Sequence, residues 1–119
     1  MPTRVINQTK GTILADRAEE ATTFGARLIG LMGRAKLDFG EGLHISPCNS
    51  IHTFFMRIPI DALFLDGELK VVKLCAAMPP WRITGVYFGA RSVLELPAGT
   101  ARASGTSEGD RLVFEGAAA

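Results

Sequence analysis

The sequence has few cysteines, no excess of charge of one sign and no long apolar run. Its two cysteines, Cys48 and Cys75, are too few for a disulfide framework, so both are expected as thiols. The 13 basic and 12 acidic side chains give a net charge of +1 and form no basic block of the kind that binds nucleic acid. No apolar run approaches the ~20 residues that span a bilayer. These absences argue against a disulfide scaffold, a nucleic-acid-binding protein and an integral membrane protein.

A signal peptide is also missing, because residues 1–5 lack the apolar core that such a peptide needs. We therefore expect a soluble cytoplasmic protein, or an exported one if a signal has been removed from this chain. The length of 119 residues predicts a single domain that folds without metal or disulfide staples. Its core is expected over residues 4–115, with a frayed tail at 116–119.

Thirteen glycines and six prolines fall between short apolar runs, which is typical of β-structure with many turns. The clearest feature is a hairpin in which Asp66-Gly67 joins strands over 62–65 and 69–74, because such a pair suits the positive φ of a tight turn. Residues 51–56, rich in β-branched and aromatic side chains, also predict a strand. The remaining strands are expected at 4–7, 12–15, 43–45, 93–96 and 111–115.

One helix and one helical turn complete the expected elements. Phe24, Leu28 and Leu31 recur at helical spacing and predict an amphipathic helix over 24–32. Residues 100–104 are expected to form one helical turn. The predicted fold class is therefore mainly β: a small barrel or sandwich-like domain with one short amphipathic helix and a helical turn.

The residue types that carry chemistry concentrate in residues 47–61. Cys48, His52 and Asp61 could act as nucleophile, base and orienting acid, or as zinc ligands. On an extended strand, however, Cys48 and His52 would stand about 13 Å apart, too far to chelate one ion. No family-type motif surrounds Cys48, and a small cysteine is most often simply buried. We keep these three residues as catalytic candidates and expect no metal and no cofactor.

Four residues are expected to line a ligand-binding mouth, and each has a structural alternative. His52 can lie at the edge of a core, and Asp61 can accept hydrogen bonds from backbone N–H groups at a turn. Arg57 can hold an anion or belong to a charged rim. Trp81 can stack on a ring of a ligand or fold back over the core.

Sequence blocks along most of the chain resemble a known family. GLMGR at residues 30–34 is similar to its N-terminal signature, and residues 48–61 are similar to its central block. Residues 93–99 and 109–111 resemble its C-terminal blocks. From about Val5 to Phe114, the chain thus resembles the bacterial and archaeal family known as domain of unknown function 192. The resemblance implies a β-barrel or sandwich-like domain and no established activity.

The central block departs from the common form of that family. The common form has a tryptophan before the methionine and a longer stretch before the aspartate, whereas here Phe55 precedes Met56 and four residues separate Met56 from Asp61. The chain is similar to the branch that carries the cysteine and histidine, here Cys48 and His52. The function of the longer form is therefore not transferred to this segment.

These observations predict a non-enzymatic domain that binds a small ligand or a partner protein at the mouth of a β-barrel, because no complete catalytic constellation is present. The alternative is a small hydrolase that uses Cys48 with His52, or a metal-dependent enzyme that uses His52 and Asp61. A third possibility is a pure interaction domain, for which an exposed apolar patch would be the sign.

Overall fold

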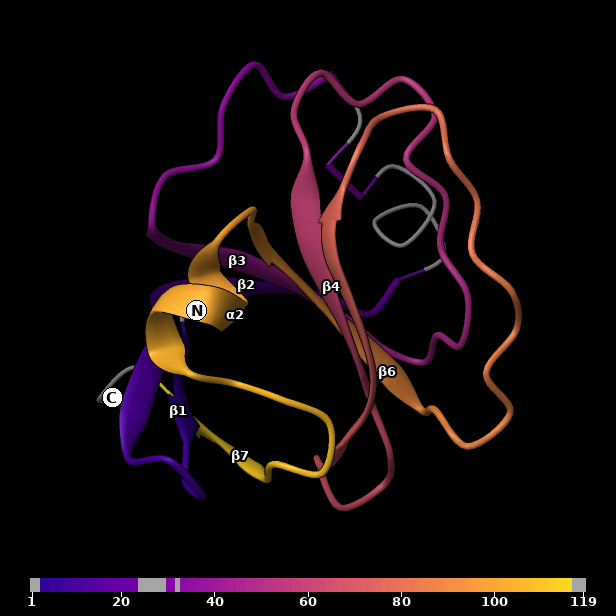
Figure 1. Ribbon diagram of the computed structural model, residues 1–119. Coiled ribbons are helices and arrows are strands. Elements are labelled where there is room, and N and C mark those ends of the chain that lie inside the picture. The colour runs from indigo at the N-terminus through magenta and orange to yellow at the C-terminus, as the bar shows by residue number, and fades with distance from the viewer. Residues whose placement is uncertain (1–2, 24–29, 32, 117–119) are drawn as a thin grey trace.

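The computed structural model describes residues 3–23, 30–31 and 33–116 of the chain. Within them, seven strands form one sheet in the order β5-β4-β6-β3-β2-β1-β7, which curls into a half-barrel (Figure 1). The elements are β1 (Thr3–Asn7), β2 (Thr12–Ala21), β3 (Gly40–Ile45), β4 (Ile60–Leu65), β5 (Val71–Met78), β6 (Ser92–Pro97), the helix α2 (Thr100–Ser104) and β7 (Leu112–Gly116). The mainly-β prediction is confirmed. No helix in the described ranges is long and apolar enough to cross a membrane.

Neighbouring strands are antiparallel, except for β2 and β3, which run parallel. The two edge strands, β5 and β7, are tied together where each of them begins. There the N–H of Val71 donates to the carbonyl of Asp110 (2.8 Å), and the N–H of Leu112 donates to the carbonyl of Leu69 (2.9 Å). These bonds pair backbone groups that would otherwise form open sheet edges.

The two faces of the sheet carry separate apolar cores, because side chains alternate along each strand. On β4, Leu63 and Leu65 point to the inner core, whereas Ala62 and Phe64 point to the outer core. The inner core, within the curl, comprises Val5, Leu14, Ala15, Ala18, Leu63, Leu65, Val71, Leu94, Leu96 and Leu112. The outer core comprises Leu31, Ile51, Met56, Ile60, Ala62, Phe64, Met78, Ala90 and Val93. Residues from loops 46–59 and 79–91 complete the outer core, and these loops lie beside β4 and β6 in Figure 1.

The predicted strand over residues 51–56 is wrong. The N–H of Thr53 donates to the carbonyl of Arg82, and the carbonyl of Thr53 accepts from the N–H of Trp81, so this backbone pairs with a loop and not with the sheet. Phe55 has a φ of 65°, which ends any extended run. Of the apolar residues that favoured a strand, Ile51 and Met56 pack in the outer core, whereas Phe55 is exposed.

The predicted hairpin around Asp66-Gly67 is confirmed, but its turn is longer than a two-residue turn. Five residues connect β4 to β5, and the positive φ (64°) falls on Leu69. The carboxylate of Asp66 accepts hydrogen bonds from the N–H groups of Glu68 and Lys70. Asp66 therefore shapes the loop through its side chain rather than through a left-handed backbone.

The helical turn at 100–104, ended by Gly105, is confirmed. The prediction of an amphipathic helix over 24–32 falls mostly on residues 24–29 and 32, which lie outside the described part of the chain. The prediction that the tail frays from residue 116 is wrong for Gly116, which pairs with Thr3 in the sheet. Residues 117–119 lie outside the described ranges.

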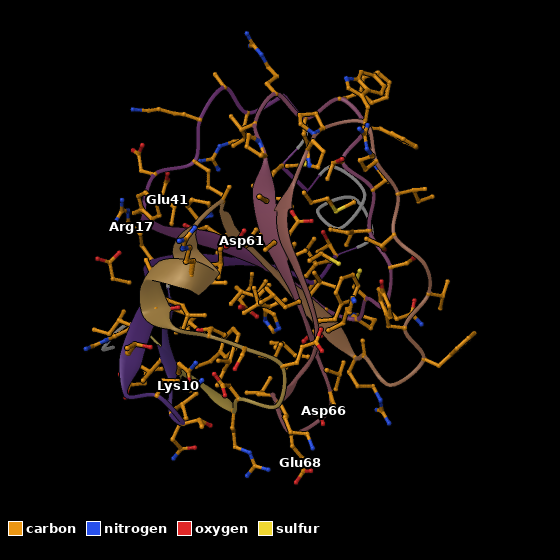
Figure 2. The ribbon with its side chains drawn as sticks, viewed as in Figure 1. Lys10, Arg17, Glu41, Asp61, Asp66 and Glu68 are labelled. Atoms are coloured by element: carbon orange, nitrogen blue, oxygen red, sulfur yellow. The ribbon has the colours of Figure 1, made fainter. Side chains whose placement is uncertain are left out.

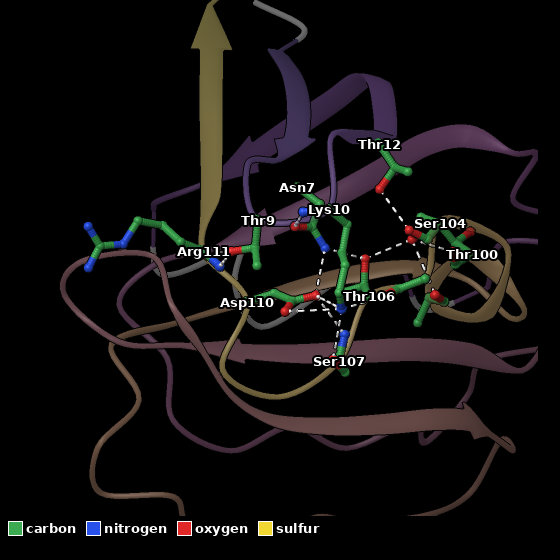
Figure 3. Close-up of polar contacts among 12 residues, drawn as sticks. Asn7, Thr9, Lys10, Thr12, Thr100, Ser104, Thr106, Ser107, Asp110 and Arg111 are labelled. Carbon is green, nitrogen blue, oxygen red and sulfur yellow. Dashed lines mark hydrogen bonds and ion pairs between the residues drawn. The ribbon is translucent and has the colours of Figure 1, made fainter.

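A polar network closes one end of the half-barrel around Asn7, which is fully buried (Figure 3). The side-chain amide of Asn7 donates to Thr106 Oγ1 and to Asp110 Oδ2, each at 2.9 Å. Lys10 Nζ forms an ion pair with Asp110 at 3.0 Å. Burial raises the pKa of Asp110, but the hydrogen bonds from Asn7, Lys10 and Ser107 outweigh it and hold the pKa below its ordinary value. The network thereby fixes the β1–β2 turn to the segment between α2 and β7.

A buried carboxylate anchors α2 to the sheet. Asp61 is 1% exposed and shares the inner face of β4 with Leu63. Its Oδ2 accepts from the N–H groups of Ala101 (2.9 Å) and Gly99 (3.2 Å), and its Oδ1 accepts from the N–H of Ala77 (2.8 Å) on β5. Hydrogen bonds to an ionised acceptor are among the strongest in proteins. Asp61 therefore joins β4, β5 and α2 through one side chain (Figure 2).

We expect Asp61→Asn to lower the free energy of unfolding by about 3 kcal/mol, because an amide has a single acceptor oxygen and leaves buried N–H groups without a partner. Asp16→Asn is the matched control, since Asp16 is exposed and pairs with its neighbour Arg17. The control is expected to change stability by less than about 0.5 kcal/mol. Urea denaturation measures both variants, and equal stabilities would contradict the anchoring role of Asp61.

Candidate functional site

Loops 46–59 and 79–91 are joined through Thr53, which is fully buried. Thr53 Oγ1 donates to the carbonyl of Pro79 at 2.7 Å and accepts from the N–H of Arg82 at 2.8 Å. The backbone of Thr53 pairs with Trp81 and Arg82 in addition. A single threonine thus uses both its hydroxyl and its backbone to hold the two loops in register.

Two of the predicted site residues, His52 and Trp81, meet on these loops in a row of aromatic rings. The imidazole of His52 stacks on the ring of Phe54, with 5.0 Å between the ring centroids. The centroid of the Phe54 ring lies 5.9 Å from that of Trp81. Trp81 also contacts Phe55 at 4.9 Å and is 56% exposed, so it does not fold back over the core. Arg57 is exposed on the same loop as His52.

The other two candidates lie apart from this row. Cys48 packs against the outer core and donates its thiol hydrogen to the carbonyl of Ser50 at 3.0 Å. Asp61 lies on the inner face of β4, where it accepts hydrogen bonds from three backbone N–H groups. The structure therefore does not bring Cys48, His52 and Asp61 together. Over the residues that the structure describes, no three His, Cys, Asp or Glu side chains are placed to share a metal ion.

A pocket of about 340 Å³ contains a histidine and a glutamate that sequence reasoning missed. We call it the His44 pocket, and it is lined by Thr3, Glu20, His44, Leu69, Phe114 and Gly116. These residues come from β1, β2, β3, β7 and the β4–β5 turn, so they converge at one end of the half-barrel. The pocket therefore lies where a barrel mouth is expected.

The His44 pocket is organised by one side-chain pair. His44 and Glu20 lie opposite each other on the parallel strands β3 and β2, and His44 Nδ1 is 3.0 Å from both carboxylate oxygens of Glu20. The imidazole side chain is 10% exposed and the carboxylate side chain 39% exposed. The ring of Phe114 lies 4.5 Å from the imidazole. The other nitrogen, His44 Nε2, is buried and has no hydrogen-bond partner among the described residues.

A second missed residue, Glu95, is buried on the outer face of β6. Its register partners are Ala62 on β4, which belongs to the outer core, and Leu43 on β3, which packs against that core. Glu95 Oε1 has no hydrogen-bond partner in the described ranges. Burial raises the pKa of Glu95 to about 8, so near neutral pH its carboxyl group is largely protonated. The only signal in the sequence is a lone charge within the apolar strand at 93–96.

Comparison of the sequence with known proteins gives matches along almost the whole chain. Residues 5–114 match the model of the family DUF192, described as Uncharacterized ACR. A UPF0127 protein of Thermococcus sibiricus is 35% identical over 116 residues, which cover 93% of this chain and 74% of that protein. A UPF0127 protein of Pyrococcus furiosus is 34% identical over 111 residues, which cover 91% of this chain and 95% of that protein.

Two solved structures share the fold. A protein of unknown function from Novosphingobium aromaticivorans has a TM-score of 0.81 and 26% identity, with 95% of this chain and 84% of that one covered. A protein from Sinorhizobium meliloti, named as a proposed transcription regulator, has a TM-score of 0.80 and 26% identity. The match covers 94% of this chain and 91% of that one. Similar sequences and structures thus come from both archaea and bacteria.

Thr53→Val tests the link between the two loops. The substitution keeps the shape of the side chain but removes the hydroxyl, which leaves the N–H of Arg82 and the carbonyl of Pro79 with one partner fewer. We expect the free energy of unfolding to fall by about 2 kcal/mol. Thr22→Val, at an exposed position, is the control and should be nearly neutral. If both variants unfold at the same urea concentration as the parent protein, the link is not stabilising.

Glu95→Gln tests the buried carboxyl group through the pH dependence of stability. Between the ordinary pKa of 4.5 and the raised pKa of about 8, the folded state keeps a proton that the unfolded state has lost. The contribution of Glu95 to stability is therefore greatest at low pH and falls as pH rises, by about 1.4 kcal/mol per pH unit at most. From about pH 5.5 to about pH 7.5 we expect the parent protein to lose about 2 kcal/mol relative to Glu95→Gln. Parallel pH profiles in urea denaturation would refute the raised pKa.

Proposed function

The chain belongs to the DUF192 family, and we propose that it is a small-ligand-binding domain whose site is the His44 pocket. The volume of about 340 Å³ falls in the range of pockets that enclose small molecules. Its position at one end of a half-barrel is a common one for such sites. Leu69 and Phe114 supply apolar surface, while His44 and Glu20 supply a few polar groups, which is the usual composition of a ligand pocket.

The observation that carries this proposal is the contact of His44 Nδ1 with both carboxylate oxygens of Glu20, at 3.0 Å each, on the wall of the pocket. The contact fixes a carboxylate that is otherwise free to rotate on the strand surface. A histidine that serves only the core normally satisfies both ring nitrogens, whereas Nε2 of His44 has no partner among the described residues. An oriented carboxylate beside an aromatic ring suits a binding site better than a packing role.

The same contacts indicate the chemistry of the ligand. A partly exposed carboxylate accepts hydrogen bonds and attracts positive charge. The ring of Phe114, which lies against the imidazole of His44 and also lines the pocket, offers an apolar and cation-attracting face. We therefore propose a ligand that carries an ammonium or another strong donor group next to a small apolar body.

The test is a titration of the isotope-labelled protein with benzylammonium, followed by the backbone amide signals in NMR spectra. We expect saturable shifts at Glu20, His44 and Phe114, and no such shifts with benzoate, whose charge is repelled by Glu20. In Glu20→Gln the affinity should fall about tenfold, since a hydrogen bond to a charged group contributes roughly 1.5 kcal/mol or more.

The matched control is Glu19→Gln, because Glu19 is the exposed neighbour of Glu20 and does not line the pocket. It should bind benzylammonium as the parent protein does. The proposal fails if benzylammonium produces no saturable shifts around the pocket, or if Glu20→Gln and Glu19→Gln bind it equally well.

A further inference from the structure

Loops 46–59 and 79–91 expose an unusual amount of apolar surface. We call it the aromatic surface, and its large exposed side chains are Phe55, Trp81, Ile83, Val86 and Phe88. Phe88 is 89% exposed, which leaves almost the whole ring in water. Single exposed apolar residues need no explanation, but five on two linked loops form the kind of patch that marks an interaction site.

Hydrogen bonds between the two loops fix the position of the aromatic surface. Thr53 joins the two loops, His52 pairs with Ile83 in an isolated β-bridge, and the N–H of Tyr87 donates to the carbonyl of Asn49. Phe55 and Trp81 have φ values of 65° and 64°, a region that bulky residues rarely adopt. Large aromatic side chains therefore stand exposed at two positions where the backbone itself disfavours them.

All the charged side chains of these two loops are positive. Neither loop contains an aspartate or glutamate, and together they carry three exposed arginines: Arg57, Arg82 and Arg91. The other residues of the chain hold 10 basic and 12 acidic side chains, so the excess of positive charge lies on these two loops. The ion pairs found among the described residues involve other cations. Arg82 Nη1 donates to the carbonyls of Pro80 and Trp81 at 3.5 and 3.4 Å, contacts with uncharged acceptors that leave its charge unneutralised.

From these observations we propose that the aromatic surface docks the protein onto bilayers that contain anionic phospholipids. Tryptophan and phenylalanine side chains enter the interfacial region of a bilayer, where an apolar ring is favourable and a polar edge stays hydrated. Arginines beside them reach the lipid phosphates while their aliphatic stems stay in the apolar layer. A carboxylate in the patch would be repelled by the same phosphates, and the two loops contain none.

Trp81 is the only tryptophan of the chain, so its fluorescence reports the docking directly. The full chain is mixed with vesicles of phosphatidylcholine alone, or of equal parts phosphatidylcholine and phosphatidylglycerol, at low ionic strength. We expect a blue shift of Trp81 emission and quenching by brominated acyl chains only with the anionic vesicles. Binding should weaken as salt is added, since the arginine–phosphate attraction is screened.

Two sets of substitutions separate the apolar and the charged contributions. Phe55→Ser with Phe88→Ser should weaken co-sedimentation with the anionic vesicles at least about tenfold, because two exposed rings are lost. Replacing Arg57, Arg82 and Arg91 by glutamine should weaken it about 100-fold, the effect expected of three cations near an anionic surface. Phe39→Ser is the matched control, since Phe39 is 65% exposed but lies outside the two loops.

The proposal is overturned if the parent protein does not co-sediment with the anionic vesicles, or if it binds neutral and anionic vesicles equally. It is also overturned if Phe39→Ser weakens binding as much as the loop variants do. Sedimentation of the free protein tests the competing occupant, a second copy of the chain. A dimer that the loop variants dissociate would assign the aromatic surface to self-association instead.

Discussion

One carboxylate sets the geometry on which much of the structure depends. Asp61 accepts three backbone hydrogen bonds from β5 and from the start of α2, in the interior of the half-barrel. Through it, α2 is fixed against β4, and the segment after α2 leads into the network around Asn7. That network in turn positions the start of β7, which pairs with β1. A carboxylate near the start of an apolar strand therefore fixes α2 and adds a side-chain link to the backbone hydrogen bonds that tie β5 to β7.

Because β4 is buried on both faces, the two sides of the sheet serve different purposes. The inner side holds the core of the half-barrel and, at one end, the His44 pocket. The outer side holds a second core that supports loops 46–59 and 79–91. Thr53 gives these loops a shape of their own without extending the sheet. The proposed ligand site and the proposed lipid surface are thus built on opposite faces of the sheet.

Most of the strands could be predicted from the sequence, whereas the loop at 46–59 and the pairings that create the pocket could not. Periodicity is local, and it correctly predicts the strands at 93–96 and 111–115. The prediction at 51–56 rests on β-branched and aromatic content and is wrong, because Ile51 and Met56 pack on the outer core from a loop while Phe55 stays exposed. The contact between Glu20 and His44 depends on a parallel pairing across a long connection, and the predicted strand at 12–15 stopped short of Glu20. The sequence allows Asp61 to be either a site residue or an acceptor of backbone N–H groups, and its three hydrogen bonds are of the second kind.

The pairing of β1 with β7 has a consequence for how the protein is made. Val5, near the start of the chain, lies opposite Phe114, near its end, and Val5 belongs to the inner core that Phe114 packs against. While the ribosome is still translating, the first strand therefore lacks one neighbour and the core lacks one wall. The early strands can form their hairpin, but the sheet cannot be completed until almost all of the described residues have emerged. During that interval the unpaired edge of β1 is a place where a nascent chain depends on protection from aggregation.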